Sequence, residues 1–419
     1  MAFSQTRFLW NGWVEELYLK PTFHFTFWGF DWIKPLPEFL MYGLVVSTLL
    51  LALMVAAGLL YRWAIILFFL AFTYMELIDV ALYLNHYYFI SLVAFLMIFL
   101  PANSGYSLDA YFGKSKGKAF IPTIYPEIIK WQLTIVYFFA GMAKIRPDWL
   151  LEAQPLKIWL STRADFPVMG PLLELDWVAY FFSWSGMIYD CTTPFFLFNK
   201  KTRPFAFITV VIFHVTTWLL FNIGMFPWIM IASTLIFFDV EDWKKIMNIL
   251  RIKLCLPSLV NLTAANSFKV PTIMKWGLII YFVLQLLVPL RQYFYPGNSL
   301  WTELGYRFSW NVMLVEKTGY CHFVVRDNST HQSWTILPKD YLTVLQEKQM
   351  SFQPDMIWQF AQKLKKNFAR KGYEDLSVFV YNKVSLNGGP SNFLIDPNMD
   401  LLAIKTPLDL HKVLLFDID

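Results

Sequence analysis

Eight long apolar runs occupy most of the first 291 residues and limit what this chain can fold into. A helix needs roughly 17–25 apolar residues to cross the hydrocarbon core of a bilayer. The chain is 57% hydrophobic and 16% charged, whereas soluble domains carry about 25% charged residues. This composition excludes an ordinary soluble enzyme and a disordered chain. The predicted spans are residues 38–60, 63–84, 86–101, 127–145, 177–198, 204–222, 223–240 and 273–291, of which the third and seventh are short.

The sequence changes character after Pro289, where polar and apolar residues begin to alternate in short stretches. These patterns predict three strands, a turn and a helix, at residues 322–326, 334–337, 376–386, 387–390 and 354–370 respectively. We therefore expect a mainly α protein in two parts. Residues 1–291 form a polytopic helical transmembrane bundle of about eight spans, and residues 292–419 form a soluble α+β domain.

Lysine and arginine are distributed unevenly over the loops between the predicted spans. The loops on one side carry most of the basic residues, among them Arg62, Lys114, Lys116, Lys118, Lys200, Lys201, Arg203, Lys244, Lys245, Arg251 and Lys253. The other loops carry only Arg146, Lys157 and Arg163, with Lys144 at a helix end. Because basic residues concentrate in cytoplasmic loops, we expect the C-terminal domain on the non-cytoplasmic side. That side is the periplasm or exterior for a bacterial plasma membrane and the lumen for the endoplasmic reticulum.

Few ionisable side chains lie inside the predicted spans, where they are costly and mark functional sites by default. Six of them are candidates for such a site, namely Glu76, Asp79, His86, Lys144, Asp190 and His214. Tyr137 and Lys144 are seven residues apart, so two helical turns place them on one face, about 10.5 Å apart along the axis. Each of three residues also has a purely structural interpretation. In these interpretations the Lys144 side chain extends to the membrane edge, His214 is a hydrogen-bonded interior histidine, and Asp190 forms an ion pair with a neighbouring helix.

The motifs of the common soluble enzymes are missing from the sequence. It contains no glycine-rich phosphate loop, no His-Glu-x-x-His motif and no serine elbow. The six histidines are scattered singly, and the three cysteines lie in different regions, so we expect no metal site. The net charge of +5 includes no long basic run, so we expect membrane lipid rather than nucleic acid as a partner.

Four groups of residues carry more specific information. They are Pro101-Ala-Asn-Ser-Gly-Tyr-Ser-Leu-Asp109, Gln132-Leu-Thr-Ile-Val-Tyr-Phe-Phe-Ala-Gly-Met-Ala-Lys-Ile-Arg-Pro-Asp-Trp149, His214-Val-Thr-Thr-Trp-Leu-Leu-Phe-Asn-Ile-Gly-Met-Phe226, and Trp310-Asn-Val-Met313 with Val384-Ser-Leu-Asn387 and Phe393-Leu-Ile-Asp-Pro397. These strings resemble segments of the vitamin K-dependent γ-glutamyl carboxylase family, part of the horizontally transferred transmembrane domain group. The resemblance covers nearly the whole chain and is most specific over 137–149.

The resemblance implies an integral membrane enzyme that couples two reactions and needs no metal. Reduced vitamin K, the hydroquinone, is oxygenated with O2 to its epoxide, and the strong base so formed allows CO2 to carboxylate the γ-carbon of a glutamate in a peptide or protein. Burial disfavours the charged form of a lysine, which suits Lys144 as the base that deprotonates the hydroquinone. The implied further roles are catalytic for His214 and Asn103, cofactor-binding for Tyr137, His86 and Asp190, and substrate-binding for Arg163.

Two departures from the family leave alternatives open. Ser104 stands where animal carboxylases have a histidine, which favours a vitamin K quinol epoxidase that does not carboxylate glutamate. A third hypothesis is a non-enzymatic membrane protein that binds quinone or lipid. The second departure, the missing long animal tail, predicts a microbial homologue. An up-and-down path of spans also puts Asn103 and Lys144 at opposite ends of the bundle, so they share a site only if residues 102–113 fold back or a span boundary is wrong.

Overall fold

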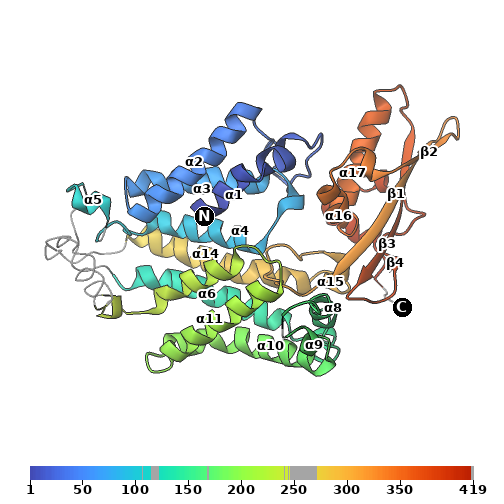
Figure 1. The fold of residues 1–419 in the computed structure, drawn as a ribbon. Helices are drawn as coiled ribbons and strands as arrows, with labels where there is room; N and C mark the ends of the chain where they lie inside the picture. Colours follow the sequence, from blue (N-terminus) through green and yellow to red (C-terminus); the bar gives the residue numbers. More distant parts are fainter. Residues whose placement is uncertain are drawn as a thin grey trace.

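The protein consists of a helical bundle that lies beside a small antiparallel sheet, as the computed structural model shows (Figure 1). The structure describes residues 1–105, 107–114, 122–167, 169–239, 241–243, 245 and 271–416. Lys116, Lys118, Lys244, Arg251 and Lys253 lie outside these described residues.

Each of the eight predicted apolar runs contains a helix. These helices are α2 (Glu38–Ala57), α3 (Tyr61–Leu77), α4 (Asn85–Phe99), α6 (Ile124–Ala143), α10 (Asp176–Phe198), α11 (Arg203–Leu220), α12 (Phe226–Thr234) and α14 (Thr272–Leu290). Within the described ranges, three helices are long and apolar enough to cross a membrane, at Glu38–Ala57, Arg203–Leu220 and Thr272–Tyr293. The figure of about eight spans therefore stays a prediction.

Two of the predicted runs form shorter helices than their hydropathy indicates. The helix in run 63–84 ends at Leu77, and Asp79 caps the 3-10 turn η2 (Val80–Leu82) by accepting a hydrogen bond from the backbone of Ala81. The helix in run 223–240 begins only at Phe226, and the 3-10 turn η3 (Leu235–Phe237) extends it. The sequence stays apolar beyond the end of α3 and before the start of α12, so hydropathy did not locate these two helix boundaries.

Short elements cluster at the two ends of the bundle. At one end lies α5 (Leu108–Tyr111), and at the other lie α8 (Leu156–Ser161) and α9 (Gly170–Leu173) (Figure 1). The other short elements are α1 (Ala2–Trp10), η1 (Glu15–Leu19), α7 (Pro147–Leu150), η4 (Arg291–Tyr293) and α15 (Ser299–Thr302). The sheet lies at the same end of the bundle as α8 and α15.

The C-terminal region forms the predicted sheet and helix. Its strands are β1 (Lys317–Asp327), β2 (Ser333–Ile336), β3 (Leu376–Leu386) and β4 (Asn392–Phe393), in the antiparallel order β2-β1-β3-β4. Its helices and 3-10 turns are η5 (Pro338–Asp340), α16 (Val344–Met350), α17 (Pro354–Ala369), η6 (Leu401–Ala403) and η7 (Pro407–Lys412). Alternate residues of β1 and β3 are buried against α17, as Phe323 packing on Phe360 illustrates. The predicted strands, the helix and the turn at Asn387 and Gly388, both with positive φ, are confirmed.

The sheet region is joined to the helical bundle by buried contacts. Phe25, from the segment after η1, lies in the same apolar core as the sheet, and its carbonyl accepts a hydrogen bond from the backbone of Val80. Gln346 of α16 donates to Asp79 at 2.7 Å. The chain between α15 and β1 then returns to the bundle, where it brings Val312 to the end of α6. This return segment completes the pocket described next.

Candidate functional site

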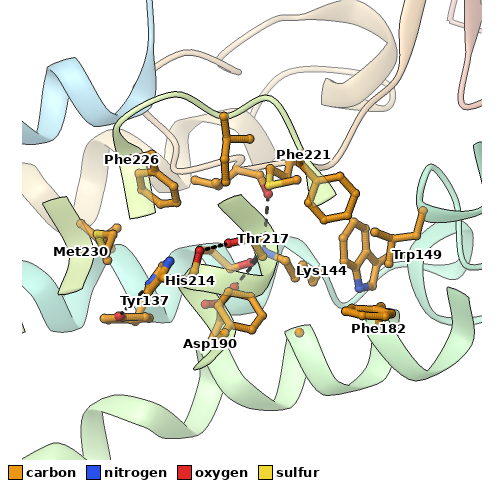
Figure 2. A pocket seen from close by; sticks show the side chains of 18 residues that line it. Tyr137, Lys144, Trp149, Phe182, Asp190, His214, Thr217, Phe221, Phe226 and Met230 are labelled. Atoms are coloured by element: carbon orange, nitrogen blue, oxygen red, sulfur yellow. Dashed lines mark hydrogen bonds and ion pairs between the residues drawn. The ribbon is translucent and has the colours of Figure 1, made fainter. Parts of the chain in front are cut away.

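A mainly apolar pocket lies between α6, α10, α11 and α12 (Figure 2). Its volume is about 60 Å³, and aromatic side chains such as Trp149, Phe182 and Phe226 form much of its wall. Its polar side chains are few, namely Tyr137, Lys144, Asp190, His214 and Thr217. A mostly apolar enclosure with a few convergent polar groups is typical of a small-molecule site.

Lys144 sits at the end of α6 and points into the protein. Its side chain is 6% exposed, so it does not snorkel to a membrane edge. Nζ donates to Asp190 Oδ2 at 2.8 Å, to the Ala140 carbonyl at 3.2 Å and to the Val312 carbonyl at 3.4 Å. The Trp149 ring lies 5.4 Å from the same nitrogen, which adds a cation–π contact. All three N–H directions of the ammonium therefore have an acceptor.

Tyr137 and His214 form a second polar group in the pocket, on neighbouring helices. The Tyr137 hydroxyl lies 3.3 Å from the Tyr189 hydroxyl and 3.4 Å from His214 Nε2. The other ring nitrogen of His214, Nδ1, is buried and has no hydrogen-bond partner among the residues that the structure describes. A buried polar atom without a partner is costly, so a ligand oxygen that bonded to Nδ1 would be held there.

A polar cavity of about 690 Å³ adjoins the pocket. Arg163, in the turn after α8, lines it and donates from Nε to the Leu220 carbonyl at 2.8 Å and from Nη2 to Asn222 at 3.0 Å. Lys348 and Glu316 also line the cavity. Its polar walls contrast with those of the pocket around Lys144.

A larger cavity, of about 1190 Å³, lies beside the pocket and is mainly apolar. Its walls include Trp218, Trp228 and residues of α1, and His86 at the start of α4 also lines it. Phe221, Ile223 and Met313 line all three cavities. These three side chains therefore separate the pocket from both neighbouring spaces.

The structure brings four of the seven residues proposed from sequence into one pocket, namely Lys144, Asp190, His214 and Tyr137. Arg163 and His86 line the two adjoining cavities.

Asn103 is not brought to the pocket. It donates to Asp109 of α5 at 2.9 Å, at the end of the bundle opposite α8 and α9. Ser104 lies in the same turn and donates to the Pro101 carbonyl. The helices follow the up-and-down path, so the expectation that Asn103 acts beside Lys144 finds no support in this geometry.

Sequence reasoning missed several residues that line the pocket or contact its polar side chains. Tyr189 resembles any interior tyrosine in an apolar helix, although its position directly before Asp190 was a usable signal. Val312 contributes its backbone carbonyl, which no side-chain pattern reveals. Met313 belongs to a string that resembles the family, but its place between cavities follows only from the fold. Among the described residues, no group of three or more His, Cys, Asp or Glu side chains is placed to hold a metal ion.

Two family models match this chain. Residues 1–243 match the HTTM domain, and residues 270–415 match the lumenal domain of vitamin K-dependent gamma-carboxylase. The first match alone covers more than half of the chain, and its helices supply every side chain around Lys144 except those of the return segment. No solved structure matches the chain.

Proposed function

The chain belongs to the vitamin K-dependent carboxylase family, and we propose that it couples oxygenation of reduced vitamin K to γ-carboxylation of glutamate. One observation carries this proposal. A buried lysine, a tyrosine and a histidine with an unpartnered nitrogen converge in an apolar pocket between a polar and an apolar cavity. A quinol is apolar with two polar oxygens, and a glutamate side chain is anionic, so the two neighbouring spaces fit two such substrates.

Lys144 is the base in this proposal. It takes a proton from a hydroquinone hydroxyl, and the pocket wall keeps water away from Nζ. A group buried to this degree exchanges protons with a bound substrate rather than with bulk solvent. The bound hydroquinone would react with O2 itself. No side chain of the protein has to form a covalent bond to it.

Tyr137 and His214 hold the hydroquinone in this proposal. The Tyr137 hydroxyl is fixed between Tyr189 and His214, and His214 Nδ1 is free to bond an oxygen of the ring. The axial separation of Tyr137 and Lys144, about 10.5 Å along α6, is suited to two contacts at opposite ends of a fused ring system. The aromatic wall from Trp149 to Phe226 supports stacking of that ring.

Arg163 and the polar cavity take the glutamate substrate in this proposal. Arg163 is held in place through Nε and Nη2, and within the described ranges Nη1 makes no hydrogen bond. A guanidinium held in this way binds a carboxylate well. The apolar cavity that His86 lines would take the isoprenoid tail. The site then faces the non-cytoplasmic side, together with the C-terminal domain.

The test is an assay of the purified full-length protein in nanodiscs. It supplies reduced vitamin K, O2, labelled bicarbonate and a glutamate peptide. Lys144→Ala should abolish both the epoxide and the label in the peptide. Lys130→Ala is the matched control, because Lys130 lies on the same helix and also forms an ion pair, with Glu127 at 2.8 Å, but lines none of the three cavities.

Each result of that assay discriminates between functions. Epoxide without fixed label would favour a quinol epoxidase over the carboxylase. Ser104 donates to the Pro101 carbonyl and lines none of the three cavities, which supports the carboxylase over this alternative. Neither product, from protein that remains folded, would favour a non-enzymatic protein that binds quinone or lipid.

A further inference from the structure

Helices α6 and α10 pack in close contact at Gly141, three residues before Lys144. A Cβ atom added to Gly141 would lie 2.6 Å from Cys191 Sγ, 2.9 Å from the Cys191 backbone nitrogen and 3.2 Å from the Asp190 carbonyl carbon. The first two distances are too short for any real side chain, and one of the atoms is backbone. Only glycine therefore permits this helix contact, as small residues commonly do between membrane helices.

The contact at Gly141 decides where Asp190 lies. Asp190 and Cys191 are the two residues of α10 that face Gly141, and the carboxylate of Asp190 reaches Lys144 Nζ at 2.8 Å. Asp190 is 7% exposed, and the pair is the only ion pair that lines this pocket among the described residues. Separating the two helices by the width of a methyl group would lengthen this contact.

The three acceptors around Nζ give the lysine a defined orientation. Asp190 and the Ala140 carbonyl accept its two shorter hydrogen bonds, at 2.8 and 3.2 Å, and both residues line the pocket. The third and longest, at 3.4 Å, goes to the Val312 carbonyl on the pocket wall. The bond to the Val312 carbonyl is the longest of the three, so a substrate oxygen in the pocket can replace it while the two shorter bonds hold the amine; Figure 2 shows these contacts of Lys144.

We propose that Asp190 is a positioning residue, held beside Lys144 by the glycine contact at Gly141, which orients the Lys144 amine and stabilises the ammonium that forms on it. This proposal rests on the function proposed above, and it replaces direct cofactor binding as the role of Asp190. The base is the neutral amine form of Lys144, whose two N–H groups keep the bonds to Asp190 and Ala140 and whose lone pair is free. When this lone pair takes the proton of a hydroxyl, an N–H bond forms, the O–H bond breaks and its electron pair stays on the oxygen. The new positive charge then lies 2.8 Å from a carboxylate, in surroundings where water cannot solvate it.

The experiment compares Asp190→Asn, Asp190→Glu and Gly141→Ala with the wild type, each as full-length protein in nanodiscs. Gly277→Ala is the control, because Gly277 also lies in an apolar helix and a Cβ there meets nothing within 4 Å. The first readout is the rate at which cyanate carbamoylates Lys144, measured by mass spectrometry with Lys130 as internal standard. Release from the ion pair should speed labelling of Lys144 about tenfold in Asp190→Asn and in Gly141→Ala.

The second readout separates kcat from KM for epoxide formation. Asp190→Asn and Gly141→Ala should lower kcat about 10- to 100-fold and change KM for the hydroquinone less than twofold, because the missing interaction is with Lys144 and not with the substrate. Asp190→Glu should restore part of kcat, which a general loss of folding would not allow. Gly277→Ala should behave as the wild type in both assays.

The two proposals fail in different ways. If Asp190→Asn leaves either the labelling rate or kcat unchanged while Lys144→Ala abolishes the epoxide, the positioning role of Asp190 is wrong. If Lys144→Ala retains activity, the role of Lys144 as the base is wrong. If the folded wild type forms neither product, the proposed function is wrong, and the labelling rates alone then decide whether Asp190 positions Lys144.

Discussion

The hydroxyl of Tyr137 lies 3.4 Å from Nε2 of His214, and the opposite nitrogen of that imidazole is buried with no partner. One edge of the histidine ring is therefore held by α6, and the residue lines the pocket. The aromatic rings of Phe213 and Phe226 lie against the imidazole, with centroids 5.4 and 5.8 Å from its own. These contacts fix the ring in advance of ligand binding, which lowers the entropy lost when a ligand binds.

Tyr137→Phe should keep the fold but loosen this arrangement. The phenyl ring fills the same space, whereas His214 and Tyr189 both lose the hydroxyl that links them. Loss of one such hydrogen bond is worth about 1 kcal/mol, so we expect about a fivefold to tenfold decrease in kcat/KM for epoxide formation. Steady-state kinetics with reduced vitamin K would measure it.

The control for Tyr137→Phe is Tyr281→Phe. Tyr281 also lies in the bundle and donates to a buried partner, Gln132 at 2.7 Å, but it lines none of the three cavities. Equal losses in the two variants would mean that the kinetic effect comes from packing of the bundle and not from the pocket.

Arg163→Gln should weaken binding of the glutamate substrate and spare the hydroquinone. Glutamine keeps a donor for the Leu220 carbonyl but lacks the charge that would pair with a carboxylate. Loss of a charged hydrogen bond of about 1.5–3 kcal/mol predicts an increase of at least about tenfold in KM for the peptide. Lys157→Gln is the control, because Lys157 is a basic residue on the neighbouring α8 whose ion pair, to Asp176, lines none of the cavities. An unchanged peptide KM in Arg163→Gln would remove Arg163 from the proposed site.

Hydropathy and alternation predicted much of the fold, because both patterns reflect which surface each element buries. All eight apolar runs hold helices, and the strand at 376–386 has the predicted bounds. The ends of α3 and α12 were wrong, since the apolar residues beyond them are buried by tertiary contacts, as with Val80 beneath the sheet region. The segment from Phe25 that completes the core of the sheet region was not predicted, because a contact over some 300 positions has no local pattern.

The sequence predicted those residues of the site whose charged or polar side chains are costly to bury in an apolar helix. Ionisable residues in apolar helices are rare, so Lys144, Asp190 and His214 stand out in the sequence itself. Asn103 was chosen by resemblance alone, and the chain path places it at the opposite end of the bundle. Nothing in the sequence pointed to Gly141, because it matters only through the missing Cβ atom, which lets α10 pack against it.

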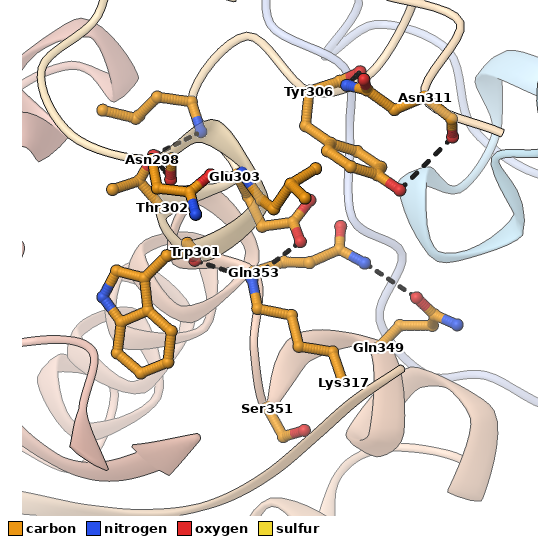
Figure 3. A network of polar contacts seen from close by, with 12 residues as sticks. Asn298, Trp301, Thr302, Glu303, Tyr306, Asn311, Lys317, Gln349, Ser351 and Gln353 are labelled. Carbon is orange, nitrogen blue, oxygen red and sulfur yellow. Dashed lines mark hydrogen bonds and ion pairs between the residues drawn. The ribbon is translucent and has the colours of Figure 1, made fainter. Parts of the chain in front are cut away.

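A buried ion pair outside the bundle should control the stability of the sheet region. Lys317, at the start of β1, donates to Glu303 at 2.8 Å and to the Trp301 carbonyl at 2.7 Å (Figure 3). Burial lowers the pKa of Lys317 and raises the pKa of Glu303, and each partner opposes the shift of the other. Lys317→Met leaves Glu303 as an unpaired buried carboxylate and should destabilise the protein by about 3–5 kcal/mol.

The double variant Lys317→Met with Glu303→Gln tests that explanation. Removing both charges should recover much of the stability lost in Lys317→Met, because an unpaired charge and not the missing bond causes most of the loss. Thermal unfolding in nanodiscs, followed by tryptophan fluorescence, would measure the three proteins. Losses that simply add in the double variant would contradict this account.

Asp79 should make the junction between bundle and sheet region sensitive to pH. It lies beyond the end of α3 and accepts hydrogen bonds from Gln346 and from the backbone of Ala81. Burial raises the pKa of Asp79 to about 7, against 3.8 for the ordinary group. The folded protein thus keeps a proton that the unfolded chain releases near pH 4, so stability from this group is complete below about pH 4 and is lost as pH rises to about 7.

Asp79→Asn, which stays uncharged, should remove that loss. Relative to the wild type, its midpoint of thermal unfolding should rise steadily between about pH 4.5 and 7.5 and then level off, since the wild-type carboxylate has by then lost its proton in both states. The total gain should be of order 1–4 kcal/mol. Asp31→Asn is the control, because Asp31 is exposed on the segment that leads from Phe25 to α2. Because the comparison is a difference between variants, acid effects elsewhere in the protein cancel. If the unfolding midpoints of Asp79→Asn and the wild type change with pH in parallel, Asp79 is already charged in the folded protein and this account is wrong.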